Sequence, residues 1–106
     1  MTPINRMQLK QMLDQDAVTL VEVLDEDQFA EFHLPGAINV PVSGNFEHDI
    51  QNAVPDHHEP VVVYCYDEDC DASPRAAERM EELGYDRVYD YAAGKMEWKM
   101  SNMPVE

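Results

Sequence analysis

The chain has 106 residues, 44% of them hydrophobic, and a formal net charge of −15 from 22 acidic and 7 basic side chains. This length predicts a single domain, residues 1–106, with one core. The excess of acids argues against nucleic acid and anionic membranes as partners, because phosphate binding needs clustered cations. No apolar stretch approaches the roughly 20 residues of a membrane span, and the first residues lack a signal-peptide pattern, so we expect a cytoplasmic protein.

The predicted elements alternate between helix and strand along the chain. In chain order we expect a helix over Ile4–Leu13, a strand over Thr19–Leu24, a short helix over Asp27–Phe32, a strand over Ala37–Val40, a helix over Phe46–Ala53, a strand over Val61–Tyr64, a helix from Ser73 to Gly84, a strand over Arg87–Tyr91 and a helix over Met96–Met100. Strands that are separated by helices indicate an α/β layer fold with right-handed crossovers.

Local signals support several of these boundaries. Asn5 suits the N-cap of the first helix, with Gln8 three residues later to complete a capping box. Pro74 fits the first position of its helix, and Gly84 fits the end of the same helix. The run Val61–Tyr64 is the most apolar segment, so we expect it at the centre of a parallel sheet that is covered on both faces.

Cys65 is the most informative residue, because it ends this apolar run and precedes the acidic stretch 66–71. A thiol at the carboxyl edge of a sheet lies where open α/β folds place their sites. The N–H groups of the loop and of the next helix start favour its thiolate. We expect both cysteines to be reduced in a chain without an export signal. Cys65 and Cys70 lack the spacing of a zinc knuckle, so we expect no metal and no cofactor.

Taken in order, several segments of the chain resemble the single-domain rhodaneses, a family of sulfurtransferases. The resemblance covers about Ile4 to Glu106 and rests on Thr19–Val23, His33–Pro41, Val61–Cys65, Ala76–Ala77 with Leu83–Tyr85, and Gly94–Trp98 with Met103–Glu106. It implies a rhodanese-like α/β fold with a mainly parallel five-stranded sheet and helices on both faces. It also implies an enzyme that carries sulfur as a persulfide on Cys65. The donor would be a polysulfide, a persulfide or thiosulfate, and the acceptor a thiol or a protein.

The chain departs from the usual rhodanese pattern at two places. Glu22 and Leu24 occupy the places of an Asp-x-Arg in the first core strand. The loop after Cys65 looks longer than usual and has neither the usual arginine nor the usual glycine. The chain is more similar to a subset of rhodanese-like proteins with a second loop cysteine, here Cys70, and a Gly-Lys-x-x-Trp ending.

The resemblance identifies Cys65 as the catalytic residue and suggests a resolving or relay role for Cys70, against an incidental loop position. The predicted active-site loop further comprises Tyr66, Asp67, Glu68, Asp69, Asp71, Ala72 and Ser73. Each loop carboxylate at about 8 Å opposes an anion by roughly 0.5 kcal/mol in water. We therefore expect weak activity with the thiosulfate dianion and a neutral or protein-bound donor. Arg75, the nearest cation in sequence, suits either substrate binding or a surface role.

Other notable side chains have simpler explanations. His57 and His58 are adjacent, but a solvated loop explains them better than a metal site does. His33 belongs to the turn motif, where we expect a structural hydrogen bond. We expect Trp98 and the pair Met96 and Met100 to lie in the core.

Two other functions compete with sulfur transfer. A noncatalytic interaction or regulatory module on a rhodanese scaffold is favoured by the missing loop arginine and opposed by the retained cysteine. A cysteine-dependent phosphatase or arsenate reductase needs an arginine after five intervening residues, where this chain has Asp71, and a carboxylate cannot cradle an anion. The acidity fits solubility, a salt-rich habitat or a basic protein partner.

Overall fold

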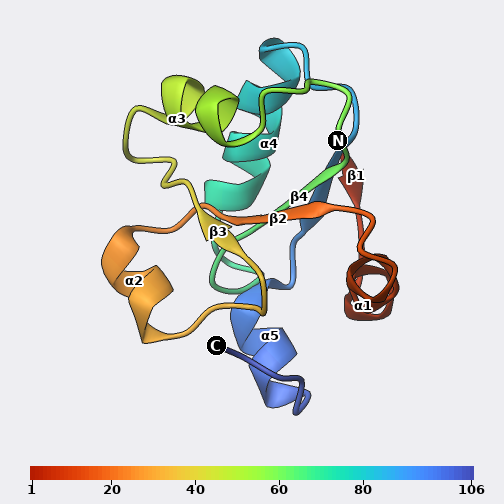
Figure 1. The fold of residues 1–106 in the computed structure, drawn as a ribbon. Coiled ribbons are helices and arrows are strands. Elements are labelled where there is room, and N and C mark those ends of the chain that lie inside the picture. Colours follow the sequence, from red (N-terminus) through yellow and green to blue (C-terminus); the bar gives the residue numbers. More distant parts are fainter.

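A computed structural model describes all 106 residues (Figure 1). Its elements in chain order are β1 (Thr2–Pro3), α1 (Arg6–Asp14), β2 (Thr19–Glu22), α2 (Glu26–Glu31), β3 (Ile38–Asn39), α3 (Phe46–Ala53), β4 (Val61–Tyr64), α4 (Ala72–Glu82), β5 (Val88–Tyr91) and α5 (Gly94–Met100). The strands form one five-stranded sheet in the order β1-β5-β4-β2-β3, and every pairing is parallel. The predicted α/β fold is therefore confirmed. None of the helices combines the length and apolarity of a membrane span.

Strand β4 lies at the centre of the sheet, as its apolar run predicts. It pairs with β2 on one side and with β5 on the other, and all four of its residues are buried. Val63 stands opposite Val21 of β2 and Asp90 of β5. Three successive valines suit this strand because branched side chains pack well on a pleated surface that is covered on both faces.

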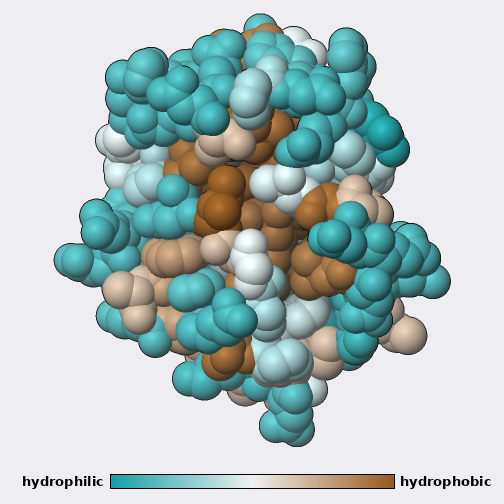
Figure 2. All heavy atoms as spheres, in the orientation of Figure 1, coloured by the Kyte–Doolittle hydropathy of each residue, from teal (hydrophilic) through white to brown (hydrophobic).

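Helices cover both faces of the sheet (Figure 1). Helices α3 and α4 pack on one face, where the core includes Val21, Phe46, Ile50, Val61, Val63, Cys65, Ala76, Ala77 and Met80. Helices α1 and α5 pack on the other face, where the core includes Leu9, Leu20, Leu34, Val62, Tyr64, Tyr91 and Trp98. Successive residues of β4 contribute to opposite cores because strand side chains alternate between faces. Cys65 thus belongs to the face that α4 covers. On the surface, hydrophilic side chains surround an apolar central region in the space-filling view (Figure 2).

The ends of the elements agree with most of the predicted signals. Asn5 caps α1, and the reciprocal hydrogen bonds with Gln8 complete the capping box. Gly84 follows the C-cap of α4 with a φ of +100°, a conformation that glycine adopts without strain. Helix α4 begins at Ala72, so Pro74 is its third residue and not its first. A proline is tolerated there because first-turn N–H groups have no partner within the helix.

Strand β1 was not predicted. It has two residues, too few for a periodic pattern, and one of them is Pro3. Thr2 and Pro3 pair with β5 at the edge of the sheet, where proline costs no ladder hydrogen bond on its solvent side.

Candidate active site at the carboxyl end of strand β4

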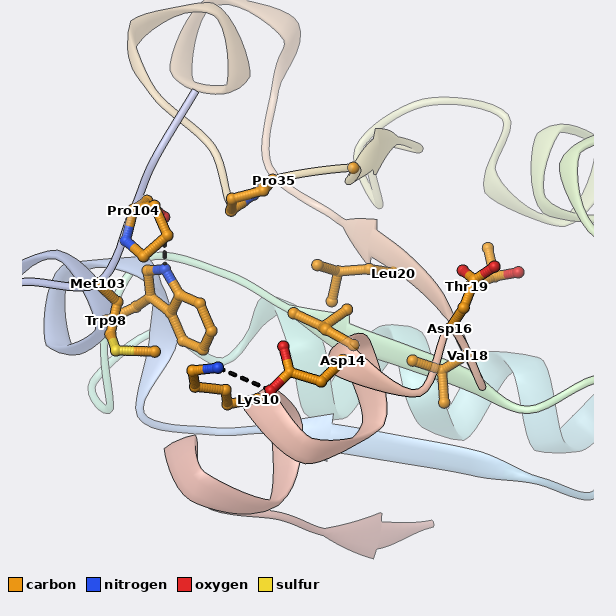
Figure 3. A pocket seen from close by; sticks show the side chains of 12 residues that line it. Lys10, Asp14, Asp16, Val18, Thr19, Leu20, Pro35, Trp98, Met103 and Pro104 are labelled. Carbon is orange, nitrogen blue, oxygen red and sulfur yellow. Dashed lines mark hydrogen bonds and ion pairs between the residues drawn. The ribbon is translucent and has the colours of Figure 1, made fainter.

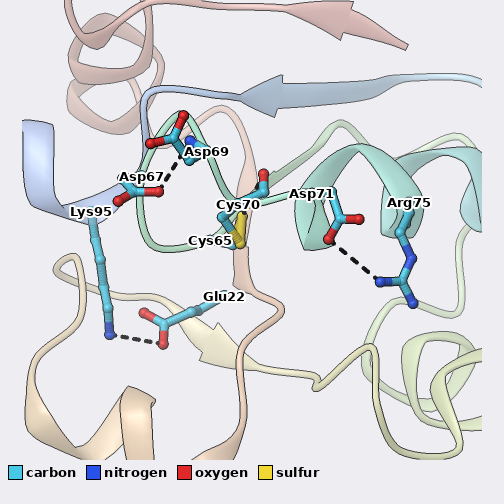
Figure 4. Close-up of a disulfide and its surroundings, with 8 residues drawn as sticks. All are labelled: Glu22, Cys65, Asp67, Asp69, Cys70, Asp71, Arg75 and Lys95. Atoms are coloured by element: carbon cyan, nitrogen blue, oxygen red, sulfur yellow. Dashed lines mark hydrogen bonds and ion pairs between the residues drawn. A yellow bond between two sulfur atoms is a disulfide. The ribbon is translucent and has the colours of Figure 1, made fainter.

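Cys65 directly follows β4 and is 1% exposed. The loop after it makes a tight turn, in which the Cys70 N–H donates to the Asp67 carbonyl oxygen at 3.1 Å. The side chain of Asp67 stabilises the same turn, since its Oδ1 accepts from the Asp69 N–H at 3.1 Å. Helix α4 starts two residues after Cys70, so the turn brings the second cysteine back over the first (Figure 4).

The structure joins Cys65 and Cys70 in a disulfide, whereas the sequence analysis expected reduced thiols. Their Cα atoms are 6.4 Å apart, within the range of about 4.4–6.8 Å that a disulfide spans. The expectation of reduced thiols came from the missing export signal, and it took no account of how the turn at Asp67 places the two side chains.

The other predicted loop residues lie around the two cysteines, but not all of their side chains face the disulfide. Glu68, Asp69 and Asp71 are exposed, Asp67 is half-buried, and Ser73 is buried in the first turn of α4. Arg75 is exposed, and its Nη1 lies 3.5 Å from Asp71 Oδ1, on the α4 side of the disulfide (Figure 4). The loop carboxylates therefore point largely into water, and the exposed Arg75 pairs with one of them.

The start of α5 holds the first two residues of the cysteine loop. The Lys95 N–H donates to the Cys65 carbonyl oxygen, and the Met96 N–H donates to the Tyr66 carbonyl oxygen, both at 3.0 Å. These bonds satisfy N–H groups that a helix start otherwise leaves without a partner. Gly94 has a φ of +80°, and a Cβ atom on it would lie 2.5 Å from backbone atoms of Tyr66 and Asp67. Only glycine fits this approach, because any larger residue would displace the loop.

A buried ion pair lies next to the start of α5, which holds the cysteine loop. Lys95 Nζ is 3.1 Å from Glu22 Oε2, and both side chains are at most 1% exposed. The same ammonium donates to the carbonyl oxygens of Gln28 and Phe32, each at 2.7 Å, at the C-terminal end of α2. Burial raises the pKa of Glu22 above its ordinary value, while Lys95 and the Tyr64 hydroxyl counteract that shift. Lys95 thus connects the loop, β2 and α2.

The sequence pattern predicted no role for Lys95. A lysine is ordinarily exposed, and this one was noted only as part of the Gly-Lys-x-x-Trp ending. A signal was nevertheless present, because Glu22 ends strand β2 between two apolar residues, Val21 and Val23. A carboxylate in a buried strand needs a cation, and the chain has only 7 lysines and arginines to supply one.

A second buried acid lies on the face that Cys65 shares. Asp90 is 2% exposed and faces α4, two residues after the core residue Val88. Its Oδ1 has no hydrogen-bond partner. Burial raises the pKa of Asp90, and the nearby Ser73 hydroxyl offsets part of this effect.

The histidines lie away from the cysteines. The Nδ1 atom of His33 is 2.9 Å from the Phe29 carbonyl oxygen, which confirms the expected structural hydrogen bond. His57 stacks on the ring of Tyr85, and Nδ1 of His58 lies 2.7 Å from a carboxylate oxygen of Asp86. No group of three or more histidine, cysteine or acidic side chains is placed to hold a metal ion.

The largest pocket, of about 480 Å³, does not include the cysteines. It lies between α1, the start of β2 and the C-terminal segment (Figure 3), and it contains none of the predicted site residues. Trp98 forms part of its wall and is otherwise buried, as expected, with its indole N–H donating to the Pro104 carbonyl oxygen at 2.7 Å.

A hollow of about 460 Å³ lies against the cysteine loop itself. It is lined by Tyr66, Asp67, Glu68, Ala93, Met96, Glu97, Met100 and Ser101. Met100 was expected in the core, but it is 76% exposed, and Met96 is only half-buried. The expectation was wrong because α5 turns only its Gly94, Lys95 and Trp98 inward.

Known proteins share both the sequence pattern and the fold. The rhodanese-like domain family matches residues 5–101 of the chain. The thiosulfate sulfurtransferase GlpE of Shewanella oneidensis is 35% identical over 95 residues, which cover 90% of this chain and 89% of that protein. The protein of the same name from Actinobacillus pleuropneumoniae serotype 7 is 29% identical over 107 residues, covering 99% of this chain and 93% of the relative.

A solved structure of a known protein has a similar fold. The BH2092 protein from Bacillus halodurans superimposes with a TM-score of 0.87 at 25% identity, over 99% of this chain and 76% of that one. The expected family is thus supported by sequence along most of the chain and by a five-stranded parallel sheet with helices on both faces. The chain belongs to the rhodanese-like domain family.

Proposed function

We propose that this protein is a sulfurtransferase that carries sulfane sulfur as a persulfide on Cys65 and passes it to a thiol or protein acceptor. The observation that carries the proposal is the position of Cys65 at the carboxyl end of the central strand, in a rhodanese-like domain. Relatives named thiosulfate sulfurtransferase, at 29% and 35% identity, support the same class of reaction.

The proposed transfer of sulfur needs no external oxidant. In the reduced protein, the Cys65 thiolate attacks the outer sulfur of a persulfide or polysulfide donor. The donor's S–S bond breaks, its remaining part leaves as a thiolate from a persulfide or as a shorter polysulfide anion from a polysulfide, and Cys65 holds the persulfide. An acceptor thiolate then attacks the outer sulfur of that persulfide, which forms the acceptor persulfide and returns Cys65 as a thiolate.

Cys70 gives the loaded protein a second route. Its thiolate attacks the inner sulfur of the Cys65 persulfide, expels hydrosulfide and leaves the Cys65–Cys70 disulfide. The Cα separation of 6.4 Å supports this step, because the two sulfurs can bond without a large backbone movement. Two equivalents of a cellular thiol then reduce the disulfide and are themselves oxidised to a disulfide, which restores both cysteines.

The loop charges favour a donor that is not a small dianion. Glu68, Asp69 and Asp71 are exposed around the cysteine pair, and the loop itself contains no basic side chain. Thiosulfate must approach through this field, whereas a neutral polysulfide species or a protein-bound persulfide is repelled less. We therefore propose weak thiosulfate activity and efficient exchange with uncharged or protein-bound sulfur.

Mass spectrometry of the pre-reduced protein tests the assignment of Cys65. After exposure to polysulfide, wild type and Cys70→Ser should gain one sulfur atom on Cys65, and Cys65→Ser should gain none while remaining folded. If no variant takes up sulfur from any donor, the noncatalytic interaction module becomes the better function. Loading of Cys70 in Cys65→Ser at the wild-type rate would contradict the role of Cys65.

The lifetime of the persulfide tests the role of Cys70. Without added thiol, loaded Cys70→Ser should keep its persulfide several times longer than wild type, which should release hydrosulfide as the disulfide forms. A Cys70→Ala variant controls for hydrogen bonding by the serine hydroxyl. Equal lifetimes in all three proteins would leave Cys70 without a part in sulfur release.

A further inference from the structure

The hollow beside the cysteine loop exposes apolar side chains that the fold does not need at that place. Tyr66 is 37% exposed and Met100 is 76% exposed, and the half-buried Met96 lines the same hollow. Met96 and Met100 are four residues apart on α5, so they share one face of that helix. We name the surface formed by Tyr66, Met96 and Met100 the methionine surface.

The methionine surface is continuous with the backbone that carries Cys65. Tyr66 is the next residue after Cys65, and its carbonyl oxygen accepts the Met96 N–H at 3.0 Å. Gly94 packs backbone to backbone against Tyr66 and Asp67. A partner that rests on the methionine surface therefore lies against the loop that presents the sulfur.

Acidic side chains form the rim of the same surface. Asp67 and Glu68 line the hollow on the loop side, and Glu97 lines it on the α5 side. Glu97 is paired with Arg6, but Asp67 and Glu68 have no basic partner. The exposed Asp69 and Asp71 extend the negative field along the loop.

We propose that the methionine surface is the docking site for a basic protein that exchanges sulfur with Cys65, an inference that rests on the function proposed above. Charge complementarity determines the occupant, because an apolar centre beside two carboxylates without a cation, those of Asp67 and Glu68, fits an apolar side chain flanked by lysine or arginine. The unbranched methionine side chains adapt to the shape of such an anchor, and an exposed tyrosine adds a rigid contact.

The same charges exclude the other classes of occupant. A second copy of this chain would bring another net charge of −15 against the acidic rim. Nucleic acid is repelled for the same reason. A small apolar molecule would leave Asp67 and Glu68 without a cation, and nothing in the hollow would then favour it over the larger pocket beside α1.

The test uses persulfide transfer from the loaded full-length protein to three synthetic cysteine peptides of equal length. The first carries leucines and lysines around its cysteine, the second has serines in place of the leucines, and the third has glutamates in place of the lysines. The rate of transfer to a small uncharged thiol is measured in parallel. Wild type should favour the first peptide over each of the others by about fivefold or more, and its advantage over the glutamate peptide should shrink as salt rises.

Substitutions then assign this preference to the methionine surface. Met100→Ser should lower kcat/KM for the leucine–lysine peptide by about fivefold and leave transfer to the small thiol unchanged. Val105→Ser, which also removes a partly exposed apolar side chain but lies outside the hollow, should change neither rate. Because Met100 is 76% exposed, its variant should unfold at the wild-type temperature.

The outcomes separate the docking site from the function on which it rests. Efficient transfer to the small thiol, with equal rates for the three peptides, would overturn the docking site and leave the sulfurtransferase standing. A preference for the leucine–lysine peptide that Met100→Ser does not change would also overturn the docking site. Failure of wild type to load any sulfur would overturn both proposals.

Discussion

Two groups of charged side chains lie near the two cysteines, and they differ in burial, in pairing and in hydrogen bonding. Glu22 and Lys95 are buried and joined to each other, and the Lys95 ammonium also donates to two backbone carbonyl oxygens. The loop acids, by contrast, are largely exposed, and most of them have no cation to pair with. The buried pair connects the cysteine loop to β2 and α2, and we propose that the exposed acids select what approaches Cys65. In this proposal, charge has a structural use inside the site and a selective use outside it.

The largest expected effect comes from breaking the buried pair. Lys95→Met should lower the free energy of unfolding by about 3–5 kcal/mol, because it leaves the Glu22 carboxylate buried without its cation. Urea unfolding followed by circular dichroism measures the change. The double variant Glu22→Leu/Lys95→Met should recover part of the loss, since the charge is then removed together with its partner.

Lys99→Met provides the matched control for that measurement. Lys99 lies on the same helix, and its Nζ is 4.7 Å from the Phe32 ring centroid, close to the 4.5 Å of Lys95, yet Lys99 is exposed. Its substitution should cost no more than about 1 kcal/mol. Equal losses for the two single variants would show that the contact with Phe32, and not the buried pair, stabilises this region.

A smaller effect is expected from Asp90, which is buried without a cation. Because burial raises its pKa above the ordinary value near 3.8, the folded protein binds this proton more readily than the unfolded chain does. The contribution of Asp90 to stability is therefore greatest at low pH and is lost as pH rises through its folded-state pKa. Asp90→Asn should accordingly be more stable than wild type at neutral pH, by about 1 kcal/mol, and the difference should shrink as pH falls.

Glu47→Gln should show the opposite dependence on pH. Hydrogen bonds from Arg79 lower the pKa of Glu47, so its stabilising contribution is present at neutral pH and is lost as pH falls below the ordinary value of 4.5. Thermal unfolding from pH 3 to 8 compares the two variants with wild type, these limits spanning roughly the ordinary carboxyl and histidine range. The same sign of pH dependence in both variants would contradict the assigned causes.

The smallest effect concerns the exposed acids. Asp67→Asn/Glu68→Gln/Asp69→Asn should raise kcat/KM for thiosulfate by about fivefold at low ionic strength, and the gain should decrease as salt is added. Asparagine at position 67 keeps the side-chain oxygen that accepts the Asp69 N–H. Efficient use of thiosulfate by wild type, with no improvement in the triple variant, would show that the loop charges do not select the donor.

The sequence predicted well those features that depend on neighbouring residues. The apolar run of β4 and the Asn5–Gln8 capping box both follow from local spacing, and both were confirmed. The predicted bounds Phe46–Ala53 of α3 also agree with the structure. Local signals were sufficient because each of these elements contains its own start, stop or periodicity.

The missed features depend on contacts and orientations that the spacing of neighbouring residues does not determine. Lys95 and Glu22 are separated by 73 positions, and nothing near either one indicates the other. The disulfide depends on a turn whose direction comes from one backbone bond to Asp67. The exposure of Met100 depends on which face of α5 meets the sheet. Two methionines on one face of a helix do not indicate whether that face is buried, because methionine suits cores and binding surfaces alike. The family resemblance rested on the order of sequence segments along the chain, and it did not predict these contacts.

The edges of the sheet restrict how any partner can attach to this molecule. Strands β1 and β3 have two residues each, and Pro3 of β1 has no N–H to offer. Partners that add a strand to a sheet need a row of free backbone donors and acceptors, and such short edges also protect a sheet from pairing with its own copies. We therefore expect partners to recognise side chains on the surface of this protein. The complex that we propose for sulfur exchange can then form and separate without strand pairing between the two sheets.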